Sequence, residues 1–386
     1  MEKQAGPMNN GTTQDRFSHG SNQDEVICGL VLAGGEGQRL QPFIKSLGMG
    51  TLPKQYVNFT GTDSMLENTW QRAKKLIPSE RVFTVISEPH LRHPEVRQQL
   101  SARSPNTVII QPENKETAPG LLLPLMHLYK RYPSSVVLVL PSDHFVLEED
   151  RLMGQARLAC LAIKQDVSRL VLLGVKPDRE EPEYGYIVPG KKAGITHPAM
   201  SEISLFIEKP DPKTARRLMQ GGGLWNTMIM AFHTGTMLHW VSRFAPVLYQ
   251  QFQQIYQAIG TPDENRVVRD TYQQMQPINF SKELLEPLVK HCPSNLLALC
   301  IRDVLWSDWG TASRVMDVLR KTGSIGQLNG FSNGAEKRAQ NRRSAISRCN
   351  DHDLQPFSAR VAAFRRARQP TKEGRANNLS VHDRIS

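Results

Sequence analysis

The sequence is poor in the features that mark membrane, secreted and zinc-binding proteins. No run of about 18 apolar residues occurs in the 386-residue chain, so no segment has the length of a membrane-spanning helix. The five cysteines include no C-x-x-C pair, which excludes a disulfide framework and the common zinc motifs. Residues 1–24 lack the basic start and apolar stretch of a secretory signal. These absences favour a cytoplasmic protein with a polar, disordered leader over residues 1–24.

The net charge of +11 is unevenly placed along the chain. Residues 331–386 hold twelve Lys or Arg against five Asp or Glu, a net +7, and apolar periodicity fades there. We therefore expect one folded domain over residues 25–330 and a basic, disordered tail over residues 331–386. No aromatic-interleaved basic strand or zinc spacing accompanies this charge, so we expect no specific nucleic-acid partner.

Short, β-branched apolar runs alternate with amphipathic stretches along the chain. The first run, residues 26–33, ends in glycines, as a buried parallel strand does. Ser64 and Glu67 have the spacing of a capping box and predict the start of a helix. This alternation predicts an α/β fold with a mainly parallel central sheet flanked by helices. In such sheets, ligands bind at the carboxyl ends of the strands. Further strand candidates are residues 82–86, 107–110, 136–140, 170–175, 205–207, 224–232 and 296–301.

A glycine-rich loop follows the first predicted strand. Gly34, Gly35 and Gly37 would let backbone N–H groups approach phosphates closely, and Arg39 adds a fixed cation. The loop is not the dinucleotide fingerprint, because Leu40 stands where the third glycine belongs. It is not a Walker loop either, because no Lys-Ser/Thr pair follows the last glycine. An ordinary tight turn would explain the glycines equally well.

The segment Leu52-Pro-Lys-Gln55, which follows the loop, favours a functional role for it over an ordinary tight turn. A glycine loop with an arginine and a downstream Pro-Lys-Gln resembles the signature of the sugar-1-phosphate nucleotidyltransferases, and among them the bacterial mannose-1-phosphate guanylyltransferases. The resemblance implies a Rossmann-like nucleotidyltransferase fold with three α/β/α layers. It also implies that the loop and Arg39 hold a triphosphate and that Lys54 acts at the phosphoryl centre. The connection over residues 43–52 is longer than usual in that family.

Two further segments resemble family elements that contact the nucleotide and the metal. Residues 111–120 resemble the guanylyltransferase segment that lies near the base, which implies nucleotide contacts. Leu140-Pro-Ser-Asp-His144 and Trp306-Ser-Asp-Trp-Gly-Thr311 resemble the two segments that each carry a metal-binding aspartate, and an Asp at the carboxyl end of a strand suits Mg²⁺. His144 is expected to be a neighbour rather than a ligand. The residues assigned in this way are Asn114, Thr117 and Ala118 for the nucleotide and Asp143 and Asp308 for Mg²⁺.

The assignment of residues that bind the sugar phosphate depends on three weaker motifs. Glu183-Tyr-Gly-Tyr-Ile187, Phe206-Ile-Glu-Lys-Pro-Asp211 and Gly223-Leu-Trp-Asn-Thr-Met228 resemble family segments that contact the sugar and its phosphate. Met228 stands where the family usually has glycine, which puts a close approach of the backbone in question. The residues assigned to the sugar phosphate are Gly185, Glu208, Lys209 and Asn226.

Together these resemblances imply transfer of GMP from GTP to mannose-1-phosphate, which yields GDP-mannose and pyrophosphate. Arg39, Lys54, Asp143 and Asp308 are the expected catalytic residues, and no strong general base is needed because the attacking phosphate is already an anion. Two alternatives stay open: a uridylyl- or thymidylyltransferase that acts on glucose-1-phosphate, and a non-catalytic nucleotide-sugar-binding regulator. The tail lacks the His-rich motif of the isomerase domain found in some relatives, so we expect no isomerase activity. The sequence leaves the oligomeric state open, with a homodimer as one arrangement.

Overall fold

The computed structural model describes residues 26–61, 63–194 and 198–324, so the predicted leader and basic tail lie outside the described residues. Nine strands form one sheet in the order β3-β2-β1-β4-β9-β6-β10-β8-β7, and β5 pairs with β11 in a separate two-stranded sheet. The strands are β1 (Val26–Ala33), β2 (Val82–Ser87), β3 (Val108–Gln111), β4 (Ser135–Pro141), β5 (Phe145–Val146), β6 (Leu170–Val175), β7 (Tyr186–Lys192), β8 (Met200–Ile207), β9 (Leu224–His233), β10 (Leu296–Ile301) and β11 (Trp306–Ser307).

The sheet is mainly parallel, which confirms the predicted fold class. β3, β2, β1 and β4 run parallel, as do β6 and β10. β9 lies antiparallel between β4 and β6, and β8 and β7 extend the sheet as antiparallel strands. The predicted strands fall within a residue or two of the observed ones, except that β8 is much longer than its predicted segment. β7 and the two-residue strands β5 and β11 were not predicted.

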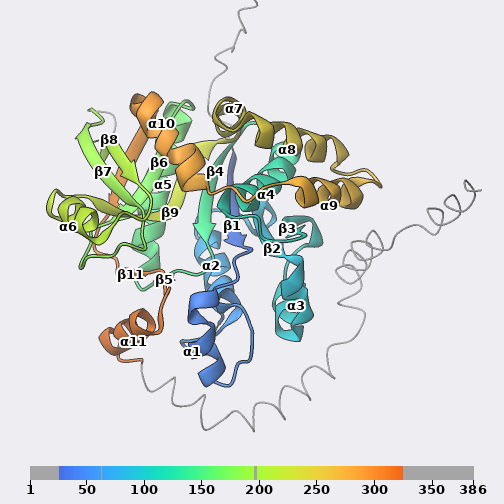
Figure 1. The fold of residues 1–386 in the computed structure, drawn as a ribbon, viewed down its shortest axis with the longest axis horizontal. Helices are drawn as coiled ribbons and strands as arrows, with labels where there is room; N and C mark the ends of the chain where they lie inside the picture. The colour runs from blue at the N-terminus through green and yellow to red at the C-terminus, as the bar shows by residue number, and fades with distance from the viewer. Residues whose placement is uncertain (1–25, 62, 195–197, 325–386) are drawn as a thin grey trace, which may run out of the picture.

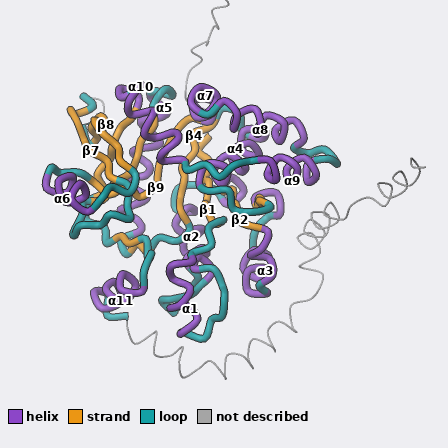
Figure 2. Tube along the Cα trace, viewed as in Figure 1, coloured by secondary structure: helices purple, strands orange, loops and turns teal. Residues whose placement is uncertain are grey.

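Helices cover both faces of the sheet, as Figures 1 and 2 show. One face packs against α2 and α5, and the other against α4, α7 and α10, with α8 and α9 outside α4. The helices are α1 (Gln41–Ser46), α2 (Met65–Lys74), α3 (Pro94–Ser101), α4 (Thr117–Arg131), α5 (Glu149–Gln165), α6 (Pro212–Gln220), α7 (Thr234–Phe244), α8 (Pro246–Ala258), α9 (Glu264–Gln274), α10 (Glu286–His291) and α11 (Ala312–Lys321).

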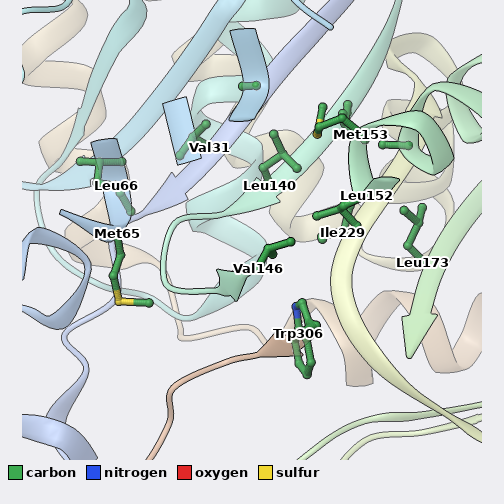
Figure 3. Close-up of a cluster of buried hydrophobic side chains, with 14 of the residues drawn as sticks. Val31, Met65, Leu66, Leu140, Val146, Leu152, Met153, Leu173, Ile229 and Trp306 are labelled. Atoms are coloured by element: carbon green, nitrogen blue, oxygen red, sulfur yellow. The ribbon is translucent and has the colours of Figure 1, made fainter. Parts of the chain in front are cut away.

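Two hydrophobic cores, one on each face, follow from the alternation of side chains along the strands. In β1, Cys28 and Leu30 pack into the core beneath α4, whereas Val31 packs into the core beneath α5. Figure 3 shows the second core, where Val31 and Leu140 from neighbouring strands face Leu152 of α5. Because both faces are covered, the central strands β1 and β6 are near-continuous apolar runs.

Local sequence signals account for several element boundaries. The capping box predicted at the start of α2 is present: the Ser64 hydroxyl accepts from the Glu67 N–H at 3.1 Å, and the Glu67 carboxylate accepts from the Ser64 N–H at 2.8 Å. Thr311 caps α11 by accepting from the Arg314 N–H. Among the described residues, no helix combines the length and the apolar character needed to cross a bilayer.

Candidate active site

The glycine loop after β1 contains two glycines whose identity is required by close packing. A Cβ on Gly34 would lie 2.5 Å from Nε2 of Gln111. Gly37 has a left-handed φ of +61°, and a Cβ there would lie 2.9 Å from Cγ of Lys54. At Gly35, by contrast, no heavy atom lies within 4 Å of the Cβ position. The loop is therefore packed against the protein at its ends and open in the middle.

Side chains from neighbouring segments tie down the carbonyl groups of this loop. The Ser87 hydroxyl, at the end of β2, donates to the Gly34 carbonyl at 2.8 Å. The Gln55 amide donates to the carbonyls of Ala33 at 2.9 Å and Gly35 at 2.8 Å. Gln55 belongs to the Pro-Lys-Gln motif, so this motif supports the backbone of the loop as well as presenting a lysine. With these carbonyls engaged, the loop can offer its N–H groups to an anion.

Lys54 joins three segments that are far apart in the sequence. It lies in the short helical turn η3 (Lys54–Tyr56), and its side chain is only 10% exposed. Its Nζ lies 2.8 Å from Oδ2 of Asp143, just beyond β4, and donates to the main-chain carbonyl of Asp308 at 3.0 Å. Lys54 therefore contacts both of the aspartates that were predicted to lie together, Asp143 through its carboxylate and Asp308 through its main-chain carbonyl.

Asp143 is a carboxylate at neutral pH despite its surroundings. Burial raises its pKa, but the charge of Lys54 and its hydrogen bond to the carboxylate outweigh burial and hold the pKa below its usual range. His144 has the opposite character, because burial lowers its pKa to about 4 and leaves it neutral. The Trp306 indole donates to Nδ1 of His144 at 3.3 Å, and Nε2 lies 3.8 Å from Asp143. His144 thus packs beside the aspartate.

Asp308 sits in a network that the sequence motifs did not predict. Nη1 of Arg314 donates to both carboxylate oxygens, at 2.8 and 3.0 Å, and the Gly310 N–H donates to Oδ1 at 3.0 Å. The Tyr184 hydroxyl also donates to Oδ1, and Arg314 forms a second ion pair with Glu181. Burial raises the pKa of Asp308, but Lys54 and Arg314 outweigh it and keep the pKa low. The only sequence signal for Arg314 is its position one turn into the helix after Asp308.

The predicted nucleotide segment opens α4. Asn114 accepts a hydrogen bond from the Glu116 N–H at 3.0 Å, and Glu116 has a φ of +72°. The Thr117 hydroxyl accepts from the Phe280 N–H at 2.8 Å. Ala118 is 3% exposed and its N–H donates to a main-chain carbonyl at 3.0 Å, so it supports the segment from within.

Gln111, at the end of β3, was not predicted as a site residue. Its Nε2 donates to the Ser87 hydroxyl at 2.9 Å. This orientation is required because that hydroxyl already donates to Gly34 and can only accept from Gln111. The Gln111 Oε1 atom is buried and has no hydrogen-bond partner. Gln111 lines the cleft, so a turn of its side chain would present this acceptor to an N–H group of a ligand.

The predicted sugar-side residues lie around Gly185. A Cβ on Gly185 would lie 2.6 Å from Oε2 of Glu208, and its carbonyl accepts from the Asn226 N–H at 2.8 Å. Burial raises the pKa of Glu208, an effect that Lys209 partly offsets. Lys209 itself is exposed and has a φ of +49°.

One cleft of ≈ 320 Å³ contacts most of the predicted residues. Arg39 and Glu183 form an exposed ion pair of 2.9 Å on its wall, between the glycine loop and the segment before β7. The structure does not bring Gly37, Ala118 or Lys209 to the wall. The predicted residues that line the cleft are Gly34, Gly35, Arg39, Lys54, Asn114, Thr117, Asp143, Gly185, Glu208, Asn226 and Asp308.

The two aspartates fit a hard divalent cation whose coordination is completed by a substrate. Both are carboxylates at neutral pH and line the same cleft. Oδ2 of Asp308 accepts from Arg314 and keeps lone pairs for a further partner. Within the part of the chain that the structure describes, no three His, Cys, Asp or Glu residues gather to enclose a metal. Mg²⁺ needs no such cage, because it takes one or two carboxylates plus phosphate oxygens and water.

A mainly parallel sheet with a glycine loop, cations and carboxylates around one cleft defines an α/β protein of the Rossmann-like class. The chain belongs to the nucleotidyl transferase family, because the model of that family matches residues 28–324. The family prediction made from the glycine loop and the Pro-Lys-Gln motif is thereby confirmed.

Relatives of known name cover most of this chain. The xanthan biosynthesis protein XanB of Xanthomonas campestris pv. campestris (strain B100) is 28% identical over 300 residues, which are 77% of this chain and 60% of XanB. The mannose-1-phosphate guanylyltransferase of Escherichia coli (strain K12) is 28% identical over 300 residues, 76% of this chain and 60% of that protein. The chain thus spans about 60% of the length of these curated relatives.

A solved structure shares the fold. The mannose-1-phosphate geranyltransferase from Thermus thermophilus has a TM-score of 0.62 and 24% sequence identity to this chain. The alignment covers 74% of this chain and 76% of that protein. The likeness supports the Rossmann-like architecture described above.

Proposed function

We propose that this protein is a sugar-1-phosphate nucleotidyltransferase that transfers GMP from GTP to mannose-1-phosphate, giving GDP-mannose and pyrophosphate. The observation that carries the proposal is the meeting of Lys54 with Asp143 and Asp308 beside an open glycine loop. The names of the relatives support the choice of guanylyl and mannosyl substrates.

In this reaction, a phosphate oxygen of the sugar-1-phosphate attacks the α-phosphorus of the triphosphate. The bond from that phosphorus to the bridging oxygen breaks, and pyrophosphate leaves with the electron pair. The attacking group is an anion near neutral pH, so the protein must align the phosphates and offset their charge rather than remove a proton. Buried His144 is neutral and unsuited to a proton-transfer role at that pH.

Each charged residue has a role that follows from its place in the cleft. Arg39 and the N–H groups at Gly35 would bind the leaving β- and γ-phosphates, and Lys54 would offset charge at the α-phosphate. Asp143 and Asp308 would hold Mg²⁺, which when bound supplies charge neutralisation between the two phosphate-bearing substrates. Lys54 is paired with Asp143, so the lysine would turn toward the incoming anion.

The base and the sugar would occupy opposite walls. Guanine carries N–H donors on its ring edge, and the unpartnered Oε1 of Gln111 beside Asn114 and Thr117 is an acceptor of the required kind. Glu208 and Asn226, on the other wall, offer an acceptor and an amide to the hydroxyl groups of a sugar. Lys209 would bind the sugar phosphate once its exposed side chain turned toward the cleft.

Pyrophosphate release tests the proposal. The purified chain would be assayed with each of four nucleoside triphosphates and with mannose-1-phosphate or glucose-1-phosphate, in the presence of Mg²⁺. We expect the highest kcat/KM with GTP and mannose-1-phosphate. Preference for UTP or dTTP with glucose-1-phosphate would instead favour the first alternative, and tight nucleotide-sugar binding without turnover would favour a regulator.

An aspartate variant with a matched control makes the assay specific to the cleft. Asp143→Asn should lower kcat by about a hundredfold or more, as expected for loss of a key electrostatic group. Asp150→Asn removes a carboxylate of the same type that is 90% exposed on α5, and it should leave kcat unchanged. Equal activities of the two variants would remove Asp143 from the reaction. The domain bounds of 25–330, the homodimer and the cytoplasmic location stay predictions.

A further inference from the structure

Met228 has a backbone conformation that disfavours its side chain. It lies within β9 with a φ of +57°, in the left-handed region that is unfavourable for residues other than glycine. The pairing of β9 with β6 shifts here, so residues 227–229 stand opposite Leu173 alone. Thr227 stabilises this bulge: its hydroxyl donates to the Leu173 carbonyl at 2.6 Å and accepts from the Ile229 N–H at 3.2 Å. The bulge turns Met228 out of the ladder.

The side chain of Met228 lies in the cleft, where its sulfur accepts a hydrogen bond from the amide of Asn226. Its Sδ accepts from Nδ2 of Asn226 at 3.4 Å and from the Ser281 hydroxyl at 3.6 Å. Its N–H donates to Oδ1 of Asn226 at 3.1 Å. Ser281 lies in the π-helical turn η7 (Ser281–Leu285), and its single hydroxyl proton can be donated either to this sulfur or to the Glu208 carboxylate. Met228 therefore lies between two polar side chains, Asn226 and Ser281, on the sugar side of the cleft.

A thioether at this place has two chemical consequences. Sulfur is a weak acceptor, so a sugar hydroxyl can replace it as the partner of Asn226. The methionine side chain also offers no N–H or O–H donor for the carbonyl of an acylamino group. Its volume is comparable to that of an acetamido group, so both cannot occupy this end of the cleft.

We propose that Met228 determines substrate specificity by limiting the size of the sugar substituent that projects toward β9. The acceptor is then a hexose 1-phosphate whose ring carries hydroxyl groups, and N-acylated amino sugars are excluded. This inference rests on the proposed function and deepens it, because it names a class of sugar that the protein rejects.

The test compares matched pairs of acceptors in wild type and Met228→Gly. Glycine adopts a φ of +57° without strain and removes the whole side chain. The kcat/KM for N-acetylglucosamine 1-phosphate would be divided by that for glucose 1-phosphate, and the N-acetylmannosamine and mannose compounds would be compared in the same way. In at least one pair, we expect Met228→Gly to raise this ratio about tenfold or more.

Two further variants keep the inference falsifiable. Met228→Asn places a shorter side chain that tolerates the left-handed region, and it should raise the same ratio to a smaller extent. Asp303→Gly relieves a similar φ of +54° at an exposed loop position, and it should leave the ratio unchanged. If Met228→Gly does not fold, Met228→Asn decides the question.

The outcomes separate this inference from the proposed function. An active wild type whose acceptor ratios do not change in either Met228 variant overturns the inference and leaves the proposed function standing. A wild type that already uses the N-acetylated acceptors as well as the plain ones overturns it in the same way. A wild type inactive with every triphosphate and hexose 1-phosphate overturns both.

Discussion

Lys54→Met is the most informative single change, because it removes one charge from the centre of the cleft and keeps most of the side-chain volume. The ammonium group of Lys54 lies 2.8 Å from the Asp143 carboxylate and 3.0 Å from the Asp308 carbonyl. Loss of this cation would remove charge stabilisation at the reacting phosphate. We expect kcat to fall by about 10²–10³-fold, the usual result of removing one such electrostatic group.

The same change should destabilise the fold only moderately. Breaking a fully buried ion pair costs about 3–5 kcal/mol, whereas an exposed pair contributes about 0–1 kcal/mol. The Lys54 side chain is 10% exposed and that of Asp143 is 34% exposed, so water can partly solvate the carboxylate that is left behind. A decrease of about 2 kcal/mol in the free energy of unfolding lies between these limits. The variant should therefore remain folded at room temperature.

Pyrophosphate release and urea denaturation measure the two effects separately. Lys75→Met is the matched control, because Lys75 pairs with Asp150 at 2.7 Å on the surface of α2 and should affect neither quantity strongly. A double variant, Lys54→Met with Asp143→Asn, should lose about as much activity as either single one if the two act as a unit. Turnover by Lys54→Met at the wild-type rate would refute the reasoning. So would an unfolded variant, since the lysine would then be structural.

Three further predictions concern the cleft and the core. Glu183→Gln removes the partner of Arg39 and should lower KM for the triphosphate by up to about fivefold without changing kcat, because an exposed pair contributes at most about 1 kcal/mol. Gly185→Ala places a Cβ 2.6 Å from the Glu208 carboxylate and should raise KM for the sugar phosphate more than KM for the triphosphate. Burial lowers the pKa of His90 from 6.5 to about 4. The unfolded chain therefore binds a proton that the folded chain does not, and as pH falls from about 6.5 to 4 this residue should lower the free energy of unfolding by about 3 kcal/mol.

Each of these predictions has a control and a contradicting result. An unchanged KM in Glu183→Gln would mean that the ion pair does not compete with phosphate. Gly154→Ala, where no atom lies within 4 Å of the Cβ position, should leave both KM values unaltered, and an equal effect of the two glycine variants would contradict the steric argument. His90→Asn should show a flatter dependence of unfolding free energy on pH than His93→Asn. Parallel curves for wild type and His90→Asn would exclude His90 as a source of acid sensitivity.

The strands and the glycine loop could be predicted because their signals are local. β1 and β4 are runs rich in Val and Leu that end at glycine or proline, and such runs favour buried strands whatever lies around them. A ligand site at their carboxyl ends follows from the geometry of parallel sheets, which is why Asp143 could be proposed from its position after β4. Gly34 and Gly37 stand where the loop backbone lies too close to the side chains of Gln111 and Lys54 for a residue with a Cβ atom.

Other features of the site depend on contacts between distant residues, and no local pattern encodes them. Arg314 and Tyr184 bind the Asp308 carboxylate only because α11 and the segment before β7 meet there, and Gln111 becomes an unpartnered acceptor only once Ser87 is beside it. The same holds for Lys209, which is exposed and does not line the cleft.

The linear order of residues was enough to predict most of the sheet, because backbone propensity and glycine geometry act over a few neighbouring positions. The family, and the residues assigned to the cleft, followed from the resemblance of its motifs. Which groups meet in the cleft depended on the folded chain, since Lys54 and the Asp308 carbonyl that it binds stand 254 residues apart. The folded chain also placed Met228 on the sugar side of the cleft, because a bulge in strand pairing sets the direction of that side chain.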